Sequence, residues 1–480
     1  MTLSNGGLNE PSLRELGALP YPPIRQAYDW CGGNPFEIQV RTCELMTENP
    51  RSYVLNSMGT GKTRAALWSF DYLRKQGSVH KMLVVCPLST MSFVWGREVL
   101  QATPHLRWTV VHGTAEKRRK LLADKKVDIY VINHDGLGVV WKEIVRRTDI
   151  DVLCLDELAA YRNWTNRTEI AQKVAATKPV VWGMTGSPMP NYVTDIYQQI
   201  KTITPHRVPR HFSWLRDELM YRLSQFKWVN KVGAIERAFQ YMQPAVRYTL
   251  DDVTELPEAV VPPPLSTELG ENQRRIYDDL RKYATTQIAK GEINAVNAGV
   301  LMGKLLQVSA GWLYDSKRHV HQLDGEARLN ALTDIIDAAN NKVIVFVNYL
   351  HALHGVYDHL CAKEYTPHLV HGDTPLKERT KIFTQFQLTS HPGPLVAHPK
   401  CLSHGLTLTA ADTVVWFGPP TSAETYDQAN ARIRRVGQKH KQLFVHLSST
   451  PIEHRVYHLL TNRILQQDSF LHLLEDASWD

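Results

Sequence analysis

The clearest pattern in the sequence is a series of short apolar runs separated by stretches of helical length. Such runs are typical of strands buried on both faces of a parallel sheet, because the helices that join parallel strands cover both faces. In the first half of the chain the runs are SYVLN (52–56), KMLVVC (81–86), VDIYVI (127–132), DVLCLD (151–156) and VVWGMT (180–185). In the second half they are KVIVFV (342–347), PHLVH (367–371), PLVAH (394–398), DTVVWF (412–417) and QLFVHL (442–447). The pattern predicts an α/β fold with two tandem lobes, each built on a doubly wound parallel sheet.

Two stretches lack this strand pattern, over residues 206–250 and 271–340. Within the second stretch, two sets of apolar residues recur at the spacing of one helix face. These sets are Ile276, Leu280 and Tyr283, and Leu329, Leu332, Ile336 and Ala339. Both stretches are therefore predicted to be helical insertions on the lobes.

The segment LPEAVVPPPLS (256–266) contains three consecutive prolines and cannot continue a helix, so we place the boundary between the lobes there. The predicted organisation is an N-terminal extension (1–35), a first lobe (36–250), a proline-rich linker (251–266) and a second lobe (267–480). An amphipathic helix is expected to close the second lobe, since its start carries the N-cap, first-turn proline and capping-box acid of a helix. These are Thr450, Pro451 and Glu453, followed by the apolar Ile452, Val456, Leu459 and Ile464.

The composition narrows the class of protein. With 43% hydrophobic and 21% charged residues over 480 positions, the chain is that of a globular protein of two or three domains, and wholesale disorder is excluded. A net charge of +7 favours a polyanionic partner without identifying one. The six cysteines form no C-x-x-C pair, so neither a disulfide framework nor a four-ligand zinc site is indicated. We see neither a leader pattern nor an apolar run of bilayer length, and we expect an intracellular, soluble chain without membrane association.

A glycine-rich segment follows the first predicted strand. In MGTGKTRAALWSF (58–70), Gly59 and Gly61 let backbone N–H groups turn round a phosphate at a helix start, and Lys62 adds a positive charge. The Thr63 hydroxyl is a candidate Mg²⁺ ligand. A full Walker pattern has glycine where this chain has Asn56, so the match is to the shorter G-x-G-K-T core. An ordinary glycine turn is the alternative interpretation.

Two adjacent carboxylates end the fourth predicted strand. In DVLCLDELAA, Asp156 is predicted to hold Mg²⁺, and Glu157 is predicted to orient and deprotonate the attacking water of a nucleotide hydrolase. The alternative is an acidic pair that faces solvent at a strand end. Because the pair occurs together with the glycine loop, the nucleotide site is favoured.

A third candidate group lies in the second lobe. The segment QANARIRRVGQ (428–438) places Gln428, Arg432 and Arg435 at the spacing of one helix face. Phosphoryl transfer needs cations beside the departing charge, and the two arginines are candidates to supply them. A basic, solvated helix is the alternative, and spacing alone does not separate the two interpretations.

These motifs resemble those of the superfamily-two helicase-type ATPases, and within them the Swi/Snf-type translocases of double-stranded DNA. In the first lobe, MGTGKT resembles motif I, LDEL resembles motif II, and GMTGSPMPN (183–191) resembles motif III. The segment VVCPLSTMSFVWGRE (84–98) resembles the family's Pro-Leu-Ser/Thr segment, which ends in Trp and Glu. In the second lobe, motif IV is resembled by VIVFVNYLHAL (343–353), and the motif that follows it by LVHGDTPLKERTKIFTQFQ (369–387). Motif V is resembled by LTLTAADTVVWFG (406–418), and motif VI by QANARIRRVGQ. The segment HPKCLSHGLTLTAAD is similar to a short, phage-borne branch, which implies the cytoplasm of a bacterial host.

The resemblance implies two tandem RecA-like lobes that use ATP and Mg²⁺. The residues it assigns to nucleotide binding are Gln39, Gly59, Thr60, Gly61, Lys62, Thr63 and Gly405, with Gln39 on the adenine and with Thr63 and Asp156 on the metal. The residues it assigns to catalysis are Lys62, Asp156, Glu157, Gln428, Arg432 and Arg435. Ser89, Thr185 and Ser403 belong to motifs that face DNA. For these three hydroxyls, capping of a helix or turn is the alternative role.

The chain departs from the family pattern at two places. Leu158 and Ala159 follow the acidic pair where the family often has a residue and then histidine, so the link between hydrolysis and motif III is expected to run through Thr185 or Gln428. Leu402 and Ser403 stand where the family has paired glycines, which makes the backbone there less permissive.

Duplex DNA is the favoured partner, bound mainly through its phosphate backbone. We expect the chain to be a monomer and see no base-reading module. Candidate contacts are EKRRKLLADKK (116–126), PHRVPR (205–210), Arg162 and Arg167, with solvated helix faces as the alternative. The favoured hypothesis is an ATP-driven translocase on duplex DNA. A strand-separating DNA or RNA helicase would share every ATP residue, and a catalytically weak nucleic-acid clamp or scaffold is the alternative from another class.

Overall fold

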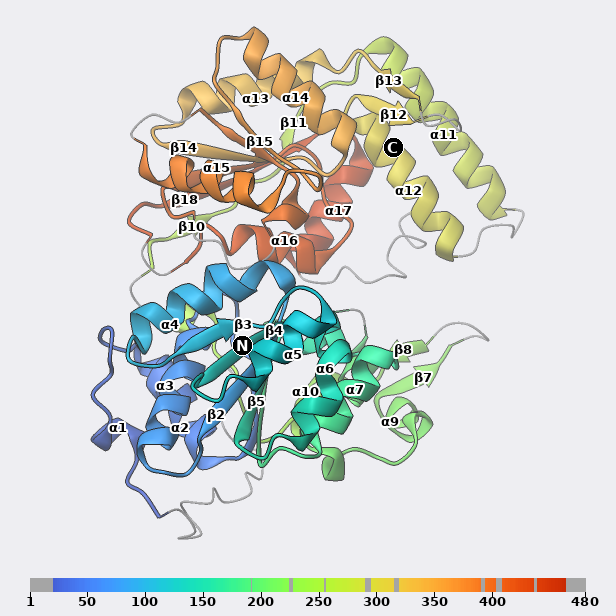
Figure 1. Ribbon diagram of the computed structural model, residues 1–480. Coiled ribbons are helices and arrows are strands. Elements are labelled where there is room, and N and C mark those ends of the chain that lie inside the picture. The colour runs from blue at the N-terminus through green and yellow to red at the C-terminus, as the bar shows by residue number, and fades with distance from the viewer. Residues whose placement is uncertain are drawn as a thin grey trace. The chain divides into compact units, whose positions relative to one another are not determined.

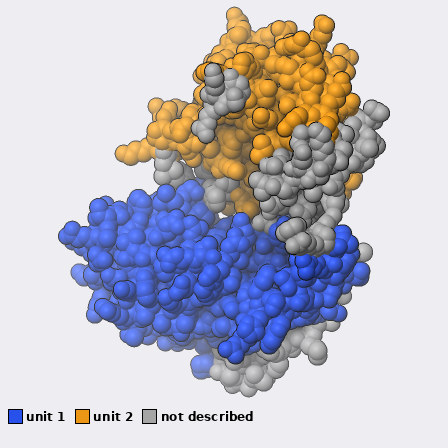
Figure 2. Space-filling model, turned by 90° about the vertical axis from the view of Figure 1, so that its right-hand side faces the viewer, with its two compact units in different colours: residues 1–254 blue, residues 255–480 orange. Residues whose placement is uncertain are grey.

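The computed structural model describes residues 20–190, 192–223, 228–253, 256–289, 295–314, 319–389, 393–402, 408–435 and 438–462. The chain divides into two compact units, Met1–Thr254 and Glu255–Asp480 (Figure 2). Each unit contains a parallel sheet with helices on both faces (Figure 1). Among the described residues, no helix combines the length and the apolar character that crossing a bilayer requires.

In the part of the first unit that the structure describes, the sheet has seven strands, and every pairing is parallel. In spatial order the strands are β3 (Trp108–Val110), β4 (Ile129–Asn133), β2 (Lys81–Cys86), β5 (Ile150–Asp156), β6 (Val180–Met184), β1 (Arg51–Val54) and β9 (Ala245–Val246). Each of the five apolar runs predicted in this half forms one of these strands. Periodicity missed β3 and β9, which are short and whose side chains are only half-buried.

Helices cover both faces of this sheet. They are α1 (Ile24–Ala27), α2 (Glu37–Glu48), α3 (Lys62–Lys75), α4 (Arg97–Ala102), α5 (Ala115–Ala123), α6 (His134–Arg146), α7 (Asn166–Ala175), α8 (Ile196–Ile203), α9 (Phe212–Leu219) and α10 (Ala234–Tyr241). Successive strand residues enter different cores: Tyr53 packs with the cluster of α6 to α10, whereas Val54 packs with that of α1 to α4. This alternation is the mark of a doubly wound sheet.

The stretch 206–250 is predicted to be a helical insertion, and it contains strands beside the helices α9 and α10. Between α9 and α10 it forms an antiparallel hairpin of β7 (Met220–Arg222) and β8 (Trp228–Asn230). It then returns to the sheet as β9, where Tyr53 pairs with Ala245. These strands are two or three residues long, too short to show a period of two.

The second unit has its own parallel sheet, in the order β10 (Ala259–Val260), β18 (Gln442–Ser448), β17 (Ala411–Trp416), β14 (Lys342–Phe346), β16 (Leu395–Ala397) and β15 (His368–Val370), and β11 (Leu265–Ser266) also pairs with β18. Its helices are α11 (Glu271–Ala289), α12 (Ala295–Ser309), α13 (Glu326–Ala338), α14 (Leu350–Ala362), α15 (Leu376–Leu388), α16 (Ala423–Asn430) and α17 (Pro451–Thr461). Ile344 packs toward α15 to α17 and Val345 toward α13 and α14. The prediction of two tandem RecA-like lobes is thereby confirmed.

Two segments of this unit differ from their sequence-based description. The proline-rich stretch is paired with the sheet on both sides of its prolines, since Ala259 aligns with Gln442 and Leu265 with Leu447. Within 271–340, α11 and α12 share a separate small core, but α13 packs directly on the sheet, and β12 (Trp312–Tyr314) and β13 (Val320–Gln322) form a hairpin. The prolines exclude a helix, as predicted, but they do not exclude pairing by their neighbours.

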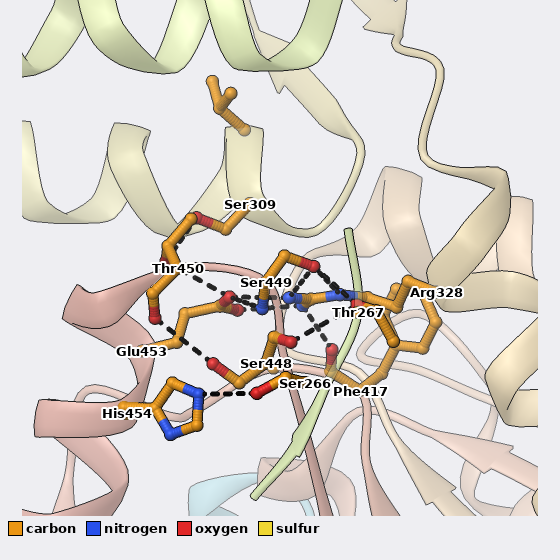
Figure 3. Close-up of polar contacts among 12 residues, drawn as sticks. Ser266, Thr267, Ser309, Arg328, Phe417, Ser448, Ser449, Thr450, Glu453 and His454 are labelled. Atoms are coloured by element: carbon orange, nitrogen blue, oxygen red, sulfur yellow. Dashed lines mark hydrogen bonds and ion pairs between the residues drawn. The ribbon is translucent and has the colours of Figure 1, made fainter. Parts of the chain in front are cut away.

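The closing helix α17 begins at the predicted place, after the N-cap residue Thr450. Glu453 reaches back to the N-terminal end of the helix, where its Oε2 accepts from the Ser449 backbone N–H at 2.7 Å. Figure 3 shows that Glu453 also faces Arg328 of α13, inside a cluster of hydroxyl groups. Ile464, the last apolar residue of the predicted helix, lies outside the described residues.

Candidate nucleotide site

Three neighbouring strands of the first unit end at the same level. In the register of the sheet, Val54 of β1 and Asp156 of β5 both align with Met184 of β6. Because the carboxyl ends of parallel strands share one edge, the glycine loop after β1 lies near Asp156 and near Thr185 after β6. Ligands of doubly wound folds bind outside this edge of the sheet.

The glycine loop has the backbone geometry of a phosphate-binding turn. Gly59 and Gly61 both have φ of 83°, in the left-handed region that favours glycine, and Gly61 is the N-cap of α3. A Cβ atom on Gly61 would stand 2.0 Å from Nε2 of Gln39. The structure therefore brings Gln39, the predicted adenine contact, directly against this loop.

The Lys62 ammonium group lies over the loop that precedes it. Its Nζ donates to the backbone oxygens of Asn56 at 2.7 Å and Ser57 at 3.0 Å. The Thr60 hydroxyl donates to the same Ser57 oxygen at 2.8 Å. Thr63 follows in the first turn of α3 and is half-buried. The predicted phosphate residues thus form one compact group.

Asn56, at the position of the missing Walker glycine, is a buried connecting residue. Its side chain is 2% exposed. Nδ2 donates to the Thr42 hydroxyl of α2 at 2.9 Å, and Oδ1 accepts from the Tyr248 backbone N–H at 2.9 Å. The asparagine side chain therefore ties the loop to the helix that carries Gln39 and to the segment after β9.

Asp156 ends β5, and each of its carboxylate oxygens accepts one hydrogen bond from the described residues. Oδ2 accepts from the indole N–H of Trp95 at 2.9 Å, and Oδ1 accepts from the Glu157 backbone N–H at 3.1 Å. Desolvation by the surrounding protein raises the pKa of Asp156, while the Trp95 bond and the Lys62 charge act in the opposite direction. A carboxylate has about four acceptor positions, so two donors leave room for further ligands. Carboxylate and hydroxyl oxygens suit Mg²⁺, and the pair Asp156 and Thr63 fits that ion.

Glu157 holds an unusual backbone conformation for a residue with a side chain. Its φ of 58° and ψ of 57° are left-handed, a strained arrangement that is concentrated at functional sites. Its Oε1 accepts from the Thr185 hydroxyl at 3.1 Å. Leu158, which follows it, is fully buried and packs at Gly183, so this position offers no polar link. Thr185, one of the two residues expected to link hydrolysis to motif III, contacts Glu157 directly.

The second-unit candidates are arranged differently from the predicted helix face. Helix α16 ends at Asn430, whose Oδ1 accepts from the Trp416 indole at 3.0 Å, so Arg432 and Arg435 lie beyond the helix and that prediction is wrong. The Arg432 backbone oxygen accepts from the Leu408 N–H, a partner outside this segment.

Within this segment, Arg432 contacts Gln428 directly. Gln428 is buried, and Arg432, also buried, donates from Nε to the Gln428 backbone oxygen at 3.0 Å. Arg435 is half-buried. The predicted residues Ser403 and Gly405 lie outside the described part of the chain.

The candidate DNA-facing residues differ in how deeply they are buried and in which partners they contact. Ser89 is half-buried in the short 3₁₀ helix Leu88–Thr90, whereas Thr185 is 1% exposed and directed to Glu157. In the basic segment 116–126, Arg118 is buried and donates to the Val111 and Gly113 backbone oxygens, so it is a structural residue. Arg167 is paired with Asp135 at 2.6 Å.

Sequence reasoning assigns no role to Trp95, although the residue lies in the segment that resembles the family's segment ending in Trp and Glu. Its side chain is fully buried, and its indole reaches Asp156. A tryptophan three residues before a glutamate was the available signal. Spacing alone could not show that the ring faces β5.

Comparisons with known proteins match both units. The SNF2-related domain family matches residues 46–310, and the helicase conserved C-terminal domain matches 327–437. An uncharacterized ATP-dependent helicase, MG018, of Mycoplasma genitalium is 23% identical over 84% of this chain and 38% of its own length. Putative protein p41 of Acyrthosiphon pisum secondary endosymbiont phage 1 is 24% identical over 82% of this chain and 88% of its own length.

Among solved structures, the Sulfolobus solfataricus SWI2/SNF2 ATPase core in complex with dsDNA aligns over 93% of this chain and 95% of that chain, with 19% identity and a TM-score of 0.43. The chain thus spans less than half of the Mycoplasma relative but most of the phage relative. The SNF2-related family match covers more than half of the residues. On that match, the chain belongs to the SNF2-related, Swi/Snf-type family of helicase-like ATPases.

Proposed function

We propose that this chain is an ATP-driven motor that moves along duplex DNA and hydrolyses ATP with DNA as the stimulus. The observation that carries the proposal is the single edge of the first sheet at which Lys62, Asp156 and Glu157 lie together. This is the set of groups that nucleotide hydrolysis requires: a cation for the phosphates, a carboxylate for a metal and a carboxylate for water.

In the proposed mechanism, the N–H groups around Gly59 and Gly61 bind the phosphates, and Gln39 binds the adenine beside them. Lys62 exchanges its loop carbonyl contacts for phosphate oxygens. Asp156 and Thr63 would hold Mg²⁺, which would supply positive charge to neutralise the phosphates. Glu157 then orients the attacking water and accepts its proton, with its carboxylate held by the Thr185 hydroxyl.

The second unit supplies the remaining charge in this proposal. Arg432 and Arg435 stabilise the phosphoryl group as it departs, which is the role of arginine fingers. Gln428 supports Arg432, since its backbone oxygen accepts from the Arg432 guanidinium group. The net charge of +7 favours a polyanion as the track, and contacts to its phosphates would make binding depend on salt but little on sequence.

Steady-state ATP hydrolysis, measured at fixed salt with duplex DNA, single-stranded DNA, forked DNA and RNA, tests the proposal. We expect duplex DNA to stimulate turnover, and Lys62→Ala and Glu157→Gln to abolish it. Lys173→Ala, at an exposed lysine of α7, is the matched control and should leave turnover unchanged. A wild-type chain that hydrolyses ATP at the same rate with and without every nucleic acid would contradict the motor proposal.

Two further assays distinguish the kinds of motor. Displacement of a triplex-forming strand without unwinding of a fork indicates translocation on duplex DNA. Fork or RNA unwinding would indicate a strand-separating helicase instead. Nucleic-acid binding without any turnover would indicate the clamp.

A further inference from the structure

Trp95 is a buried aromatic residue whose polar atom is directed into the candidate site. It lies in the π-helical turn Met91–Gly96 that precedes α4, and its side chain is fully buried. Single π-helical turns occur frequently at functional sites. The indole N–H donates to Oδ2 of Asp156 at 2.9 Å.

The partner of this indole differs from those of two other buried tryptophans in the same core. Trp68 donates to the Cys31 backbone oxygen, and Trp182 donates to the Met46 backbone oxygen. Any buried indole needs an acceptor, and a backbone oxygen satisfies it without a further consequence. Trp95 instead holds the side chain that is proposed to bind the metal.

The contact determines how the Asp156 carboxylate is oriented. An aspartate side chain rotates about two bonds, and the torsion that sets the carboxylate plane is broad. Here the Trp95 indole holds one oxygen and the Glu157 backbone N–H holds the other, so the plane of the carboxylate is fixed from two sides. Both donors come from elements packed in the first unit.

The same segment also contacts the glycine-loop helix. Glu98 of α4, three residues after Trp95, accepts from Nε of Arg64 at 2.8 Å. Arg64 directly follows Thr63 in the first turn of α3. Residues 95–98 therefore contact both the end of β5 and the start of α3, the two elements that supply the proposed metal ligands.

We propose that Trp95 is a positioning residue that fixes the Asp156 carboxylate for binding of Mg²⁺ together with ATP. This inference rests on the proposed function and deepens it, since it assigns a specific task to a residue outside the nucleotide contacts. Removal of a hydrogen-bond partner of a metal ligand typically lowers metal affinity by about 10- to 100-fold.

The test is binding of a fluorescent, non-hydrolysable ATP analogue to the full chain over a series of Mg²⁺ concentrations. Trp95→Phe keeps the ring but removes the donor, and Trp182→Phe is the matched control, a buried indole that bonds a backbone oxygen. We expect Trp95→Phe to need about tenfold more Mg²⁺ for half-maximal binding. Binding in EDTA should match the wild type, and Trp182→Phe should show the wild-type Mg²⁺ requirement.

The outcomes separate the inference from the proposed function. If the wild type binds the analogue and Trp95→Phe shows an unchanged Mg²⁺ requirement, or loses binding in EDTA as well, the positioning role is overturned. If the wild type binds no nucleotide under any condition, the proposed function fails first.

A second measurement does not depend on the Trp95 variant being folded. With ¹⁵N-labelled tryptophan, one indole N–H resonance of the wild type should shift when Mg²⁺ and the analogue are added together, and Asp156→Asn should abolish that shift. If no indole resonance responds in the wild type, the inference is overturned.

Discussion

Arg328 and Glu453 form a buried ion pair between α13 and α17, with Nη2 of the arginine 2.6 Å from Oε2 of the glutamate. Their side chains are 2% and 0% exposed. The arginine also donates to the Phe417 backbone oxygen at 2.8 Å and to the Ser449 hydroxyl (Figure 3). The pair therefore joins two helices to the ends of β17 and β18.

Breaking this pair should destabilise the second unit strongly. Removal of one member of a buried ion pair leaves an unpaired buried charge and costs roughly 3–5 kcal/mol. We expect Arg328→Met and Glu453→Leu each to lower the free energy of unfolding of the second unit by this amount. Hydrogen exchange of the β18 amides measures that free energy within the full chain. The double variant should lose less free energy of unfolding than the sum of the two single variants, although the Phe417 oxygen and the Ser449 N–H lose their partners.

The exposed pair of Lys441 and Glu258, 2.9 Å apart, is the control. Lys441→Ala should leave β18 exchange unchanged, because solvent screens an exposed pair. Strictly additive effects of the two buried substitutions would contradict the direct interaction.

Thr185→Val should reduce turnover while nucleotide binding is retained. The substitution keeps the shape of the side chain but removes the hydroxyl that donates to Glu157. A hydrogen bond to a charged group contributes about 1.5–3 kcal/mol, so we expect turnover to fall by about tenfold or more. Thr185→Ser keeps the hydroxyl and should retain most of the rate in the same steady-state assay. Equal losses in both variants would show that the methyl group, and not the hydroxyl, matters.

Asn56→Ala should weaken nucleotide binding by about tenfold, because the Tyr248 N–H and the Thr42 hydroxyl lose a buried partner at a cost of roughly 1–3 kcal/mol. Asn56→Gly restores the Walker pattern but not these contacts, and its nucleotide affinity should be no higher than that of Asn56→Ala. Titration with a fluorescent ADP measures both affinities. Asn49 directly follows α2, and its side chain donates to the Leu45 backbone oxygen. Asn49→Ala removes this local bond and serves as the control. Wild-type affinity of Asn56→Gly would contradict a connecting role for this side chain.

Much of the fold could be predicted because the main strands are continuous apolar runs. KMLVVC forms β2 over the same residues, and DVLCLD begins one residue earlier as β5. The glycine loop and the acidic pair were likewise found from local sequence. Periodicity is a property of neighbouring residues, and it identifies elements whose burial is uniform along their length.

The remainder depends on contacts between distant segments. The helix predicted through Arg435 ends at Asn430, where a bond from Trp416 and the Leu408 pairing of Arg432 decide the path of the chain. Glu453 was predicted to cap a helix, and it also pairs with an arginine 125 positions away. For Glu453 the sequence gives a correct local role, and in both cases the partner is remote in the sequence and has no recurring spacing.

Arg435→Ala should leave ATP binding nearly intact while turnover falls by about 10³-fold or more. This expectation follows from the proposed role of the arginine as a charge that acts on the transition state and not on the bound substrate. Single-turnover hydrolysis and equilibrium binding of the ATP analogue measure the two quantities. Arg434→Ala, at the preceding position, is the control and should retain turnover. A comparable loss of affinity in Arg435→Ala would identify a ground-state contact instead.

The stability of the second unit should fall as the pH is lowered from about 6.5 toward 4, and His351 should be one cause. His351 of α14 is 7% exposed and packs near the rings of Tyr314 and Tyr349. Neither of its ring nitrogens has a hydrogen-bond partner among the described residues. Burial lowers its pKa to about 4. Because this value lies below that of the unfolded chain, the unfolded state takes up the proton first as the pH falls, and stability is lost across this window.

His351→Phe should therefore flatten the pH dependence. Each pH unit of difference in pKa corresponds to about 1.4 kcal/mol, so the variant should recover at most about 3 kcal/mol at pH 4 relative to the wild type. Burial also lowers the pKa of His446 to about 4, and that residue maintains part of the dependence in the variant. Calorimetric unfolding at several pH values measures the difference, with the exposed His458→Gln of α17 as the control that should follow the wild type. A variant whose loss of stability between pH 6.5 and 4 equals that of the wild type would show that His351 already gains its proton in the folded state.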